Sequence, residues 1–375
     1  MANTLNLGTD GNWGVKKDSL LGYNSENGNF KPLAFNFDRA SSATVINKDG
    51  LIETVGSGEP RIDFSNDAKG ALLLEPTRSN LIKSSGDIST QSTYWLPNQG
   101  GTSVQNATTA PDGSNTASQI NTFSQQYGGI TQGSISVSNT EYTYSVYLKA
   151  KNGTPNIRLI FFDGATFHSS DFTISSEWKR YDYKFTPVSG SFQIYITCPN
   201  VVASFYTWGA QLEQGSYATS YTPTSGSVVT RVQDACTNGG NEQVINSTEG
   251  VLYAEISAFD NDSTAKAITI SQSSTNILGF YYYQSRIDAY VKVGTNQFFK
   301  THYLDTTINN KISLKYKTND FALWVNGVEV GSLVGSGTTP SGLNQLSFTD
   351  TGGSHFYGNV KDVRVYNTAL TDSEL

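Results

Sequence analysis

The sequence predicts an all-β protein built from sandwiches or barrels. In residues 142–149 the side chains of Tyr142, Tyr144, Val146 and Leu148 alternate with more polar neighbours. This period of two is typical of a strand with one buried face. A helical period does not persist over three turns anywhere in the chain. Short strands repeated at this spacing indicate sandwiches or barrels, not alternating strand–helix–strand units.

The other expected strands are β-branched or aromatic runs bounded by Gly, Asn, Ser or Pro, as turn chemistry requires. They cover residues 157–162, 180–185, 192–197, 205–212, 251–259, 277–283, 287–293, 312–317, 321–325, 343–348 and 360–366. The sharpest local prediction is a hairpin at Asn326 and Gly327, which separate two apolar runs. An Asn-Gly pair suits a type I′ turn because both of its central residues need positive φ.

Composition excludes several classes of protein. The 375 residues include 25 Lys and Arg against 32 Asp and Glu, so the formal net charge is 25 − 32 = −7. Nucleic-acid binders need clustered positive charge, so this balance argues against one. Aromatic residues make up 12% of the chain, which predicts a folded protein rather than a disordered one. We expect no signal peptide and no membrane insertion, because residues 1–21 lack an apolar core and no stretch is apolar enough to span a bilayer.

Two composition breaks suggest three parts. Residues 83–86 follow an apolar run, and residues 221–227 form a Pro/Ser/Gly stretch. We therefore predict domains at 1–83, 84–224 and 225–375.

The first part carries four linked motifs, FDRASSAT at 37–44, GLIET at 50–54, PRIDF at 60–64 and LLLEPTRSNL at 72–81. Their succession resembles the N-terminal segment of many tailed-bacteriophage virion proteins. The resemblance implies that residues 1–83 attach the chain to other virion proteins. It also implies a homotrimeric fibre, or a capsid or tail decoration protein, that localises to the virion and assembles in the host cytoplasm.

The other two parts resemble known sandwich domains. The middle part, with its YTYSVYLK, WGAQLE and ATSYTP motifs at 142–149, 208–213 and 218–223, resembles the carbohydrate-binding-like jelly rolls that follow that segment in phage fibres. The last part, with the Asn326–Gly327 hairpin and YGNVKDVRVYN at 357–367, is similar to concanavalin A-like or laminin-G-like sandwiches. The resemblance implies a fibre that projects from the particle and binds host surface glycans.

No catalytic constellation is evident. Glycosidases need paired carboxylates, and the nearest approach to a concanavalin A-like catalytic triplet, Glu255 to Asp260, has the wrong spacing. His168, His302 and His355 lie too far apart in sequence for a zinc motif. We therefore predict neither an enzyme nor a cofactor. Two alternatives stay open: a purely structural decoration protein, and a polysaccharide depolymerase whose carboxylates meet across a trimer seam.

Candidate glycan contacts are the consecutive Tyr281, Tyr282 and Tyr283, and Trp324 beside the predicted hairpin. Sugar sites on sandwiches use exposed aromatic faces. Since strand side chains alternate, at least one of the three tyrosines faces away from the others. That side is solvent, a glycan or a neighbouring subunit, and Trp324 has the alternative of packing against the second sheet or a partner chain.

Three further expectations concern charges and thiols. Asp260 and Asp262 offer oxygen ligands for calcium, with a solvated turn as the alternative. Cys198 and Cys236 are expected to be free thiols. In the N-terminal segment we hypothesise that some of the charged residues form intersubunit pairs; these are Arg39, Glu53, Arg61, Asp63, Glu75 and Arg78.

Overall fold

The computed structural model describes residues 3–30 and 33–375, so residues 1–2 and 31–32 of the predicted N-terminal segment lie outside the described residues. Contacts divide the chain into two compact units. Unit 1 comprises residues 1–50, 55–76 and 232–375, and unit 2 comprises residues 51–54 and 77–231.

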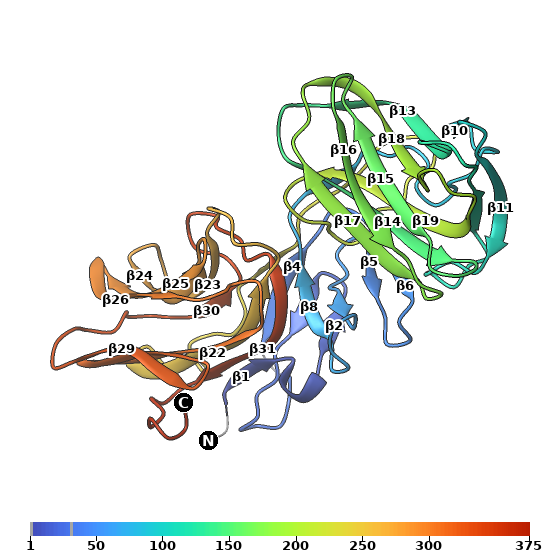
Figure 1. Cartoon of the computed structure of the whole chain (residues 1–375). Helices are drawn as coiled ribbons and strands as arrows, with labels where there is room; N and C mark the ends of the chain where they lie inside the picture. The colour runs from blue at the N-terminus through green and yellow to red at the C-terminus, as the bar shows by residue number, and fades with distance from the viewer. Residues whose placement is uncertain (1–2, 31–32) are drawn as a thin grey trace. The chain divides into compact units, whose positions relative to one another are not determined.

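Unit 1 is an antiparallel β-sandwich whose two layers are visible in Figure 1. The first sheet has the order β29 (Val328–Val334), β28 (Asp320–Val325), β27 (Asn310–Lys317), β22 (Glu249–Ala258), β31 (Gly358–Tyr366), β8 (Ala71–Leu74) and β7 (Ile62–Asp63), and β1 (Leu5–Leu7) also pairs with β31. The second has the order β26 (Thr295–Tyr303), β25 (Arg286–Val293), β24 (Asn276–Tyr282), β23 (Lys266–Ser271) and β30 (Gln345–Ser347). Alternate apolar side chains of both sheets, such as Leu314 and Ile268, form one core between them.

The N-terminal segment is part of this sandwich. In β1, Leu5 pairs with Val365, and in β8, Leu74 pairs with Gly358. A smaller sheet, β2 (Gly14–Lys16), β3 (Ser19–Leu21), β4 (Ala34–Asp38) and β21 (Ala235–Thr237), joins the same segment to residues after 231. The two contact-based units therefore differ from the three predicted domains, because residues of the N-terminal segment share unit 1 with residues 232–375. The domain boundaries at 83 and 224 stay a prediction.

Unit 2 has two antiparallel five-stranded sheets over a second core. One has the order β10 (Trp95–Asn98), β13 (Gly129–Val137), β18 (Gly190–Thr197), β15 (Asn156–Phe162) and β16 (Phe167–Thr173). The other has the order β11 (Thr102–Thr108), β12 (Ala117–Asn121), β19 (Ser204–Gln214), β14 (Tyr142–Ala150) and β17 (Lys179–Phe185). A short ladder joins β9 (Arg78–Asn80) to β20 (Val229–Arg231). The remaining elements of the chain are the 3-10 turn η1 (Thr9–Gly11), β5 (Ala43–Ile46) and β6 (Ile52–Val55).

The predicted all-β class is confirmed. Each strand expected from alternation is present, and the hairpin between β28 and β29 has φ 53° at Asn326 and 79° at Gly327, as a type I′ turn requires. No helix among residues 3–30 and 33–375 has the length and apolar character needed to span a membrane.

The hypothesis of intersubunit pairs fails for Arg39, Arg61 and Glu75. Their side chains are at most 2% exposed, and both arginines pair with Asp234 of the same chain. Groups buried this deeply within one unit are not available to another subunit.

Candidate functional site

The three consecutive tyrosines alternate across the second sheet of unit 1. Tyr282 is 1% exposed and lies in the core with Phe280 and Ile287. This corrects the prediction for Tyr282, because a side chain inside the sandwich is not available to a glycan. Tyr281 and Tyr283 are half-buried and point to the opposite, outer face.

Trp324 lies on a different surface. Its neighbours Leu323 and Val325 enter the core, so the half-buried Trp324 lies on the outer face of the first sheet, paired with Ser313 of β27. The two sheets cover opposite sides of the core. The structure therefore brings Tyr281 and Tyr283 together and leaves Trp324 apart from them.

Further aromatic side chains surround Tyr281 and Tyr283. Tyr290 of β25 lies 6.1 Å from Tyr281, ring centre to ring centre, and pairs across strands with Phe299 of β26. Phe299 is 50% exposed, and Tyr303, farther along β26, is 75% exposed. We call these five residues, Tyr281, Tyr283, Tyr290, Phe299 and Tyr303, the tyrosine face.

A buried carboxylate fixes the centre of the tyrosine face. The Asp288 side chain is 1% exposed and accepts hydrogen bonds from Arg286 Nε at 2.9 Å and Thr301 Oγ1 at 2.5 Å. The Arg286 guanidinium in turn lies 4.7 Å from the centre of the Tyr283 ring. Burial, together with the negative charge of Asp288, raises the pKa of Tyr281 above its ordinary value.

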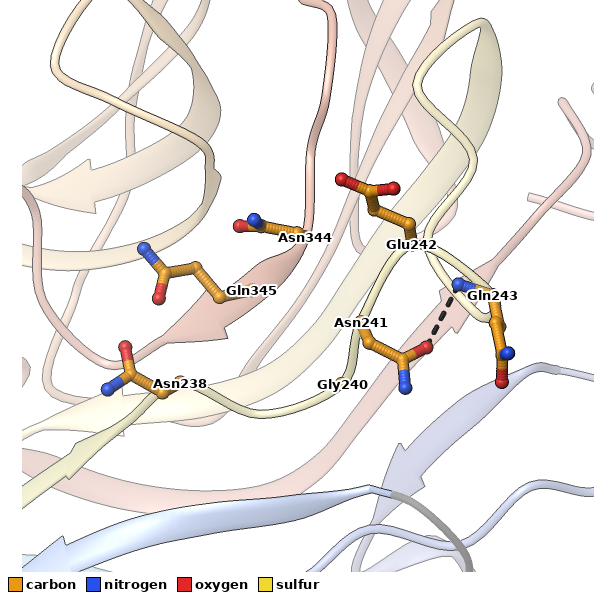
Figure 2. A pocket seen from close by; sticks show the side chains of 7 residues that line it. All are labelled: Asn238, Gly240, Asn241, Glu242, Gln243, Asn344 and Gln345. Carbon is orange, nitrogen blue, oxygen red and sulfur yellow. Dashed lines mark hydrogen bonds between the residues drawn. The ribbon is translucent and has the colours of Figure 1, made fainter.

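A polar pocket of about 490 Å³ lies in the same unit. Figure 2 shows the side chains of Asn238, Asn344 and Gln345 on one side of it and those of Asn241, Glu242 and Gln243 on the other. Asn241 is fixed by its own turn, since its Oδ1 accepts the N–H of Gln243 at 2.9 Å. We call this site the amide pocket.

The amide pocket adjoins the outer face of the second sheet. Gln345 of β30 donates from Nε2 to Ser271 Oγ of β23 at 3.4 Å, which places both side chains on that face. At the same edge, the Asn238 N–H donates to Ser347 Oγ at 3.0 Å. The exposed rings on β25 and β26 and the pocket beyond β30 therefore belong to the same sheet, but the outward side chains of β23 between them, Ala267, Thr269 and Ser271, are buried.

This arrangement has the chemistry that carbohydrates require. Aromatic rings stack on the apolar faces of sugar rings, while amides and carboxylates form hydrogen bonds with hydroxyls. Sequence reasoning missed Phe299, Tyr303 and the pocket residues. One feature of the sequence could have indicated the pocket: Asn, Gln and Glu are concentrated in residues 238–243. Phe299 and Tyr303 had no such signal, because β26 is polar and its apolar and polar residues do not alternate regularly.

Asp260 and Asp262, the predicted calcium ligands, both lie beside the ammonium group of Lys266. The Lys266 ammonium lies 3.2 Å from Asp260 Oδ1 and 2.5 Å from Asp262 Oδ1, so a side chain of the protein already supplies the positive charge. No group of three metal-ligating side chains occurs among the residues that the structure describes. Of the three histidines, His168 is held by a hydrogen bond of 2.8 Å between Nε2 and Asp163 Oδ2.

Residues 254–375 match the model of a family described as the concanavalin A-like lectin/glucanases superfamily (Laminin_G_3). No curated protein sequence matches the chain. The predicted concanavalin A-like sandwich is thus confirmed for the C-terminal part.

Several solved structures are similar to parts of the chain at low identity. The CBM40 domain of the Ruminococcus gnavus IT-sialidase, bound to α2,3-sialyllactose, is 12% identical over 37% of this chain and 91% of that one, with a TM-score of 0.31. The CBM22-1 xylan-binding domain of Paenibacillus barcinonensis Xyn10C is 12% identical over 38% and 94%, with a TM-score of 0.30. Domains LG4-5 of the mouse laminin α1 chain are 10% identical over 80% and 92%, with a TM-score of 0.27. At such TM-scores the likeness says nothing about ligands.

Proposed function

We propose that the chain is a carbohydrate-binding protein with no chemistry of its own, and that unit 1 holds its glycan on the outer face of the second sheet. One observation carries this proposal: exposed aromatic rings on β26 lie beside the Arg286–Asp288 pair on the outer face of this sheet, and a separate amide pocket lies at the sheet's other edge. Residues 254–375, which match the lectin-like family model, contribute the whole tyrosine face and part of the amide pocket. Tyr281 and Tyr283 stay candidate contacts, and Tyr303 and Phe299 join them.

We further propose that the protein is a fibre-like structural component of a tailed-phage virion and binds glycans on the host surface. The motifs between residues 37 and 81 support this, through their resemblance to virion proteins. Homotrimerisation and contact with other virion proteins belong to the same proposal. Light scattering of the full chain tests the trimer, and a stable monomer would count against it.

Binding of the labelled full chain to a panel of bacterial cells tests the function. The proposal expects saturable binding that is lost when surface polysaccharide is stripped from the cells. A folded chain of the correct oligomeric state that binds no cell would instead favour the decoration protein.

A further inference from the structure

A cleft of about 570 Å³ lies within unit 2, and none of its lining residues belongs to the tyrosine face or the amide pocket. It is formed where β9 passes the ends of β13 and β19. Its lining contains one cation, Arg78, with the polar residues Thr77, Ser79, Ser136 and Gln214, and is completed by Gly215, Leu81 and Tyr142.

Arg78 has unused hydrogen-bonding capacity in this cleft. Its Nη1 donates to the Thr77 carbonyl at 3.3 Å, which is the one hydrogen bond of this guanidinium within the described residues; its Nε also has no partner there but is buried, so a ligand would meet the Nη groups. A guanidinium carries five N–H donors in a rigid planar fork, and burying a donor without a partner costs free energy. The side chain is 21% exposed, so the cleft still gives access to it.

Gly215 and the ring of Tyr217 lie close to the guanidinium of Arg78. Gly215 has φ +140°, and an added Cβ there would lie 2.6 Å from Arg78 Nη2. The ring of Tyr217 lies 5.4 Å from the guanidinium carbon. A residue larger than glycine at position 215 would therefore displace the guanidinium.

The carboxylate of Glu213 lies near Arg78 but does not accept a hydrogen bond from it. Glu213 Oε2 is 3.9 Å from Arg78 Nε, which is beyond hydrogen-bonding distance. Glu213 is instead held by Thr219, through N–H at 2.9 Å and Oγ1 at 2.6 Å, and by Gln211 Nε2 at 2.6 Å. These hydrogen bonds direct the Glu213 carboxylate toward Thr219 and Gln211, and burial raises its pKa above the ordinary value.

We propose that this Arg78 cleft binds the carboxylate of an acidic sugar, such as a uronic or sialic acid residue of a polysaccharide. A guanidinium fork matches a planar carboxylate in two parallel hydrogen bonds. The hydroxyls of Thr77, Ser79 and Ser136 and the amide of Gln214 suit the hydroxyl groups of the same sugar. This site goes beyond the proposed function, because it lies in the other unit and selects for a charge that the tyrosine face does not require.

Titration calorimetry of the full chain tests the proposal with four probes: oligomers of galacturonate, mannuronate, hyaluronan and sialic acid, each beside its methyl ester. We expect at least one acid to bind, and its ester to bind about tenfold to a hundredfold more weakly, as loss of a charge-assisted contact implies. Arg78→Gln should weaken binding of the acid by a similar factor and leave the ester unaffected.

Two further variants distinguish a loss of binding at the cleft from a loss caused by misfolding. Gln214→Glu adds a negative charge to an exposed side chain of the cleft, so it should weaken binding of the acid without altering thermal unfolding. Gln126→Glu adds the same charge to another exposed position in unit 2 and should have no effect. Failure of all four acids to bind, or unchanged binding in both folded cleft variants, overturns the proposal.

The outcomes separate this site from the proposed function. If Tyr303→Ala weakens binding of acids and esters alike while Arg78→Gln does nothing, the tyrosine face stands and the cleft does not. If Arg78→Gln and Gln214→Glu weaken binding of the acids while Tyr303→Ala has no effect, the carboxylate site in unit 2 is supported and the glycan site on unit 1 is contradicted.

Discussion

Arg61 and Asp234, 173 residues apart in the chain, form a fully buried ion pair with 2.5 Å between Nη2 and Oδ2. The other oxygen of Asp234 accepts Arg39 Nη1 at 3.0 Å, and Arg61 Nη1 donates to Glu75 at 2.6 Å. Burial disfavours the charge on Arg61, yet the carboxylates of Asp234 and Glu75 outweigh it and raise the pKa above its ordinary value. This cluster joins the N-terminal segment to the start of the C-terminal part of unit 1.

Asp234→Asn should destabilise unit 1 strongly. The substitution removes the negative charge that the buried guanidinium groups of Arg39 and Arg61 share. Breaking a buried ion pair in this way lowers the free energy of unfolding by about 3–5 kcal/mol. Denaturant unfolding measures the change. Asp171→Asn is the matched control, because Asp171 pairs with Arg158 at the surface and should cost less than about 1 kcal/mol. Equal losses in the two variants would show that the buried cluster has no special role.

Asp163 should make unit 2 more stable at neutral than at acid pH. Burial alone would raise its pKa, but hydrogen bonds from His168 and from the N–H groups of Ala165, Thr166 and Val188 lower it well below its ordinary value. A carboxylate with a lowered folded-state pKa adds stability above its unfolded pKa, near 4, and loses it as the pH falls through the folded value.

Asp163→Asn should therefore lower the free energy of unfolding at neutral pH, and the deficit should shrink as the pH drops below about 4. Urea unfolding across this pH range measures it, with the exposed Asp49→Asn as control. A deficit that stays constant with pH would contradict the account.

Calcium should not stabilise the protein through Asp260 and Asp262. The Lys266 ammonium already lies within ion-pair distance of both carboxylates, so a divalent cation would have to displace it. Thermal unfolding with millimolar calcium or with a chelator should give midpoints within about 1 °C of each other. An increase of several degrees with calcium would restore the site that the sequence predicted.

Both thiols should be inert in the native protein. Cys198 and Cys236 are free, as expected, and 1% exposed, and burial raises both pKa values. A thiol reagent should react slowly with the folded chain, because the thiolate is the reactive form and both thiols are buried with raised pKa values. After unfolding, the same reagent should react readily with both thiols. Rapid reaction of the folded protein would mean that one of these cores opens readily.

Local pattern predicted the strands that have one apolar face. Alternation at 142–149 and the Asn326–Gly327 pair each determine a strand or turn from neighbouring residues alone, and both are confirmed. Strand β26 was missed because the exposed Phe299 and Tyr303 lie among polar residues at the edge of its sheet.

The candidate site depends on pairings that local sequence does not encode. Alternation predicted that the three tyrosines divide between two faces, but did not show that Tyr282 is the one in the core. Nor did it show that Asp288 lies opposite Tyr281, or that residues 238–243 meet Asn344 and Gln345. These follow from register and from contacts across about a hundred residues of chain.

Tyr303 has the most exposed aromatic ring of the proposed glycan site. Titration calorimetry with the purified surface polysaccharide of the cell that binds best should show about tenfold weaker binding for Tyr303→Ala, and near-normal binding for Tyr303→Phe, which keeps the ring. Phe123→Ala, which removes an exposed ring from unit 2, should bind like the wild type. Undiminished binding by a folded Tyr303→Ala and Phe299→Ala double variant would contradict a glycan site on the outer face.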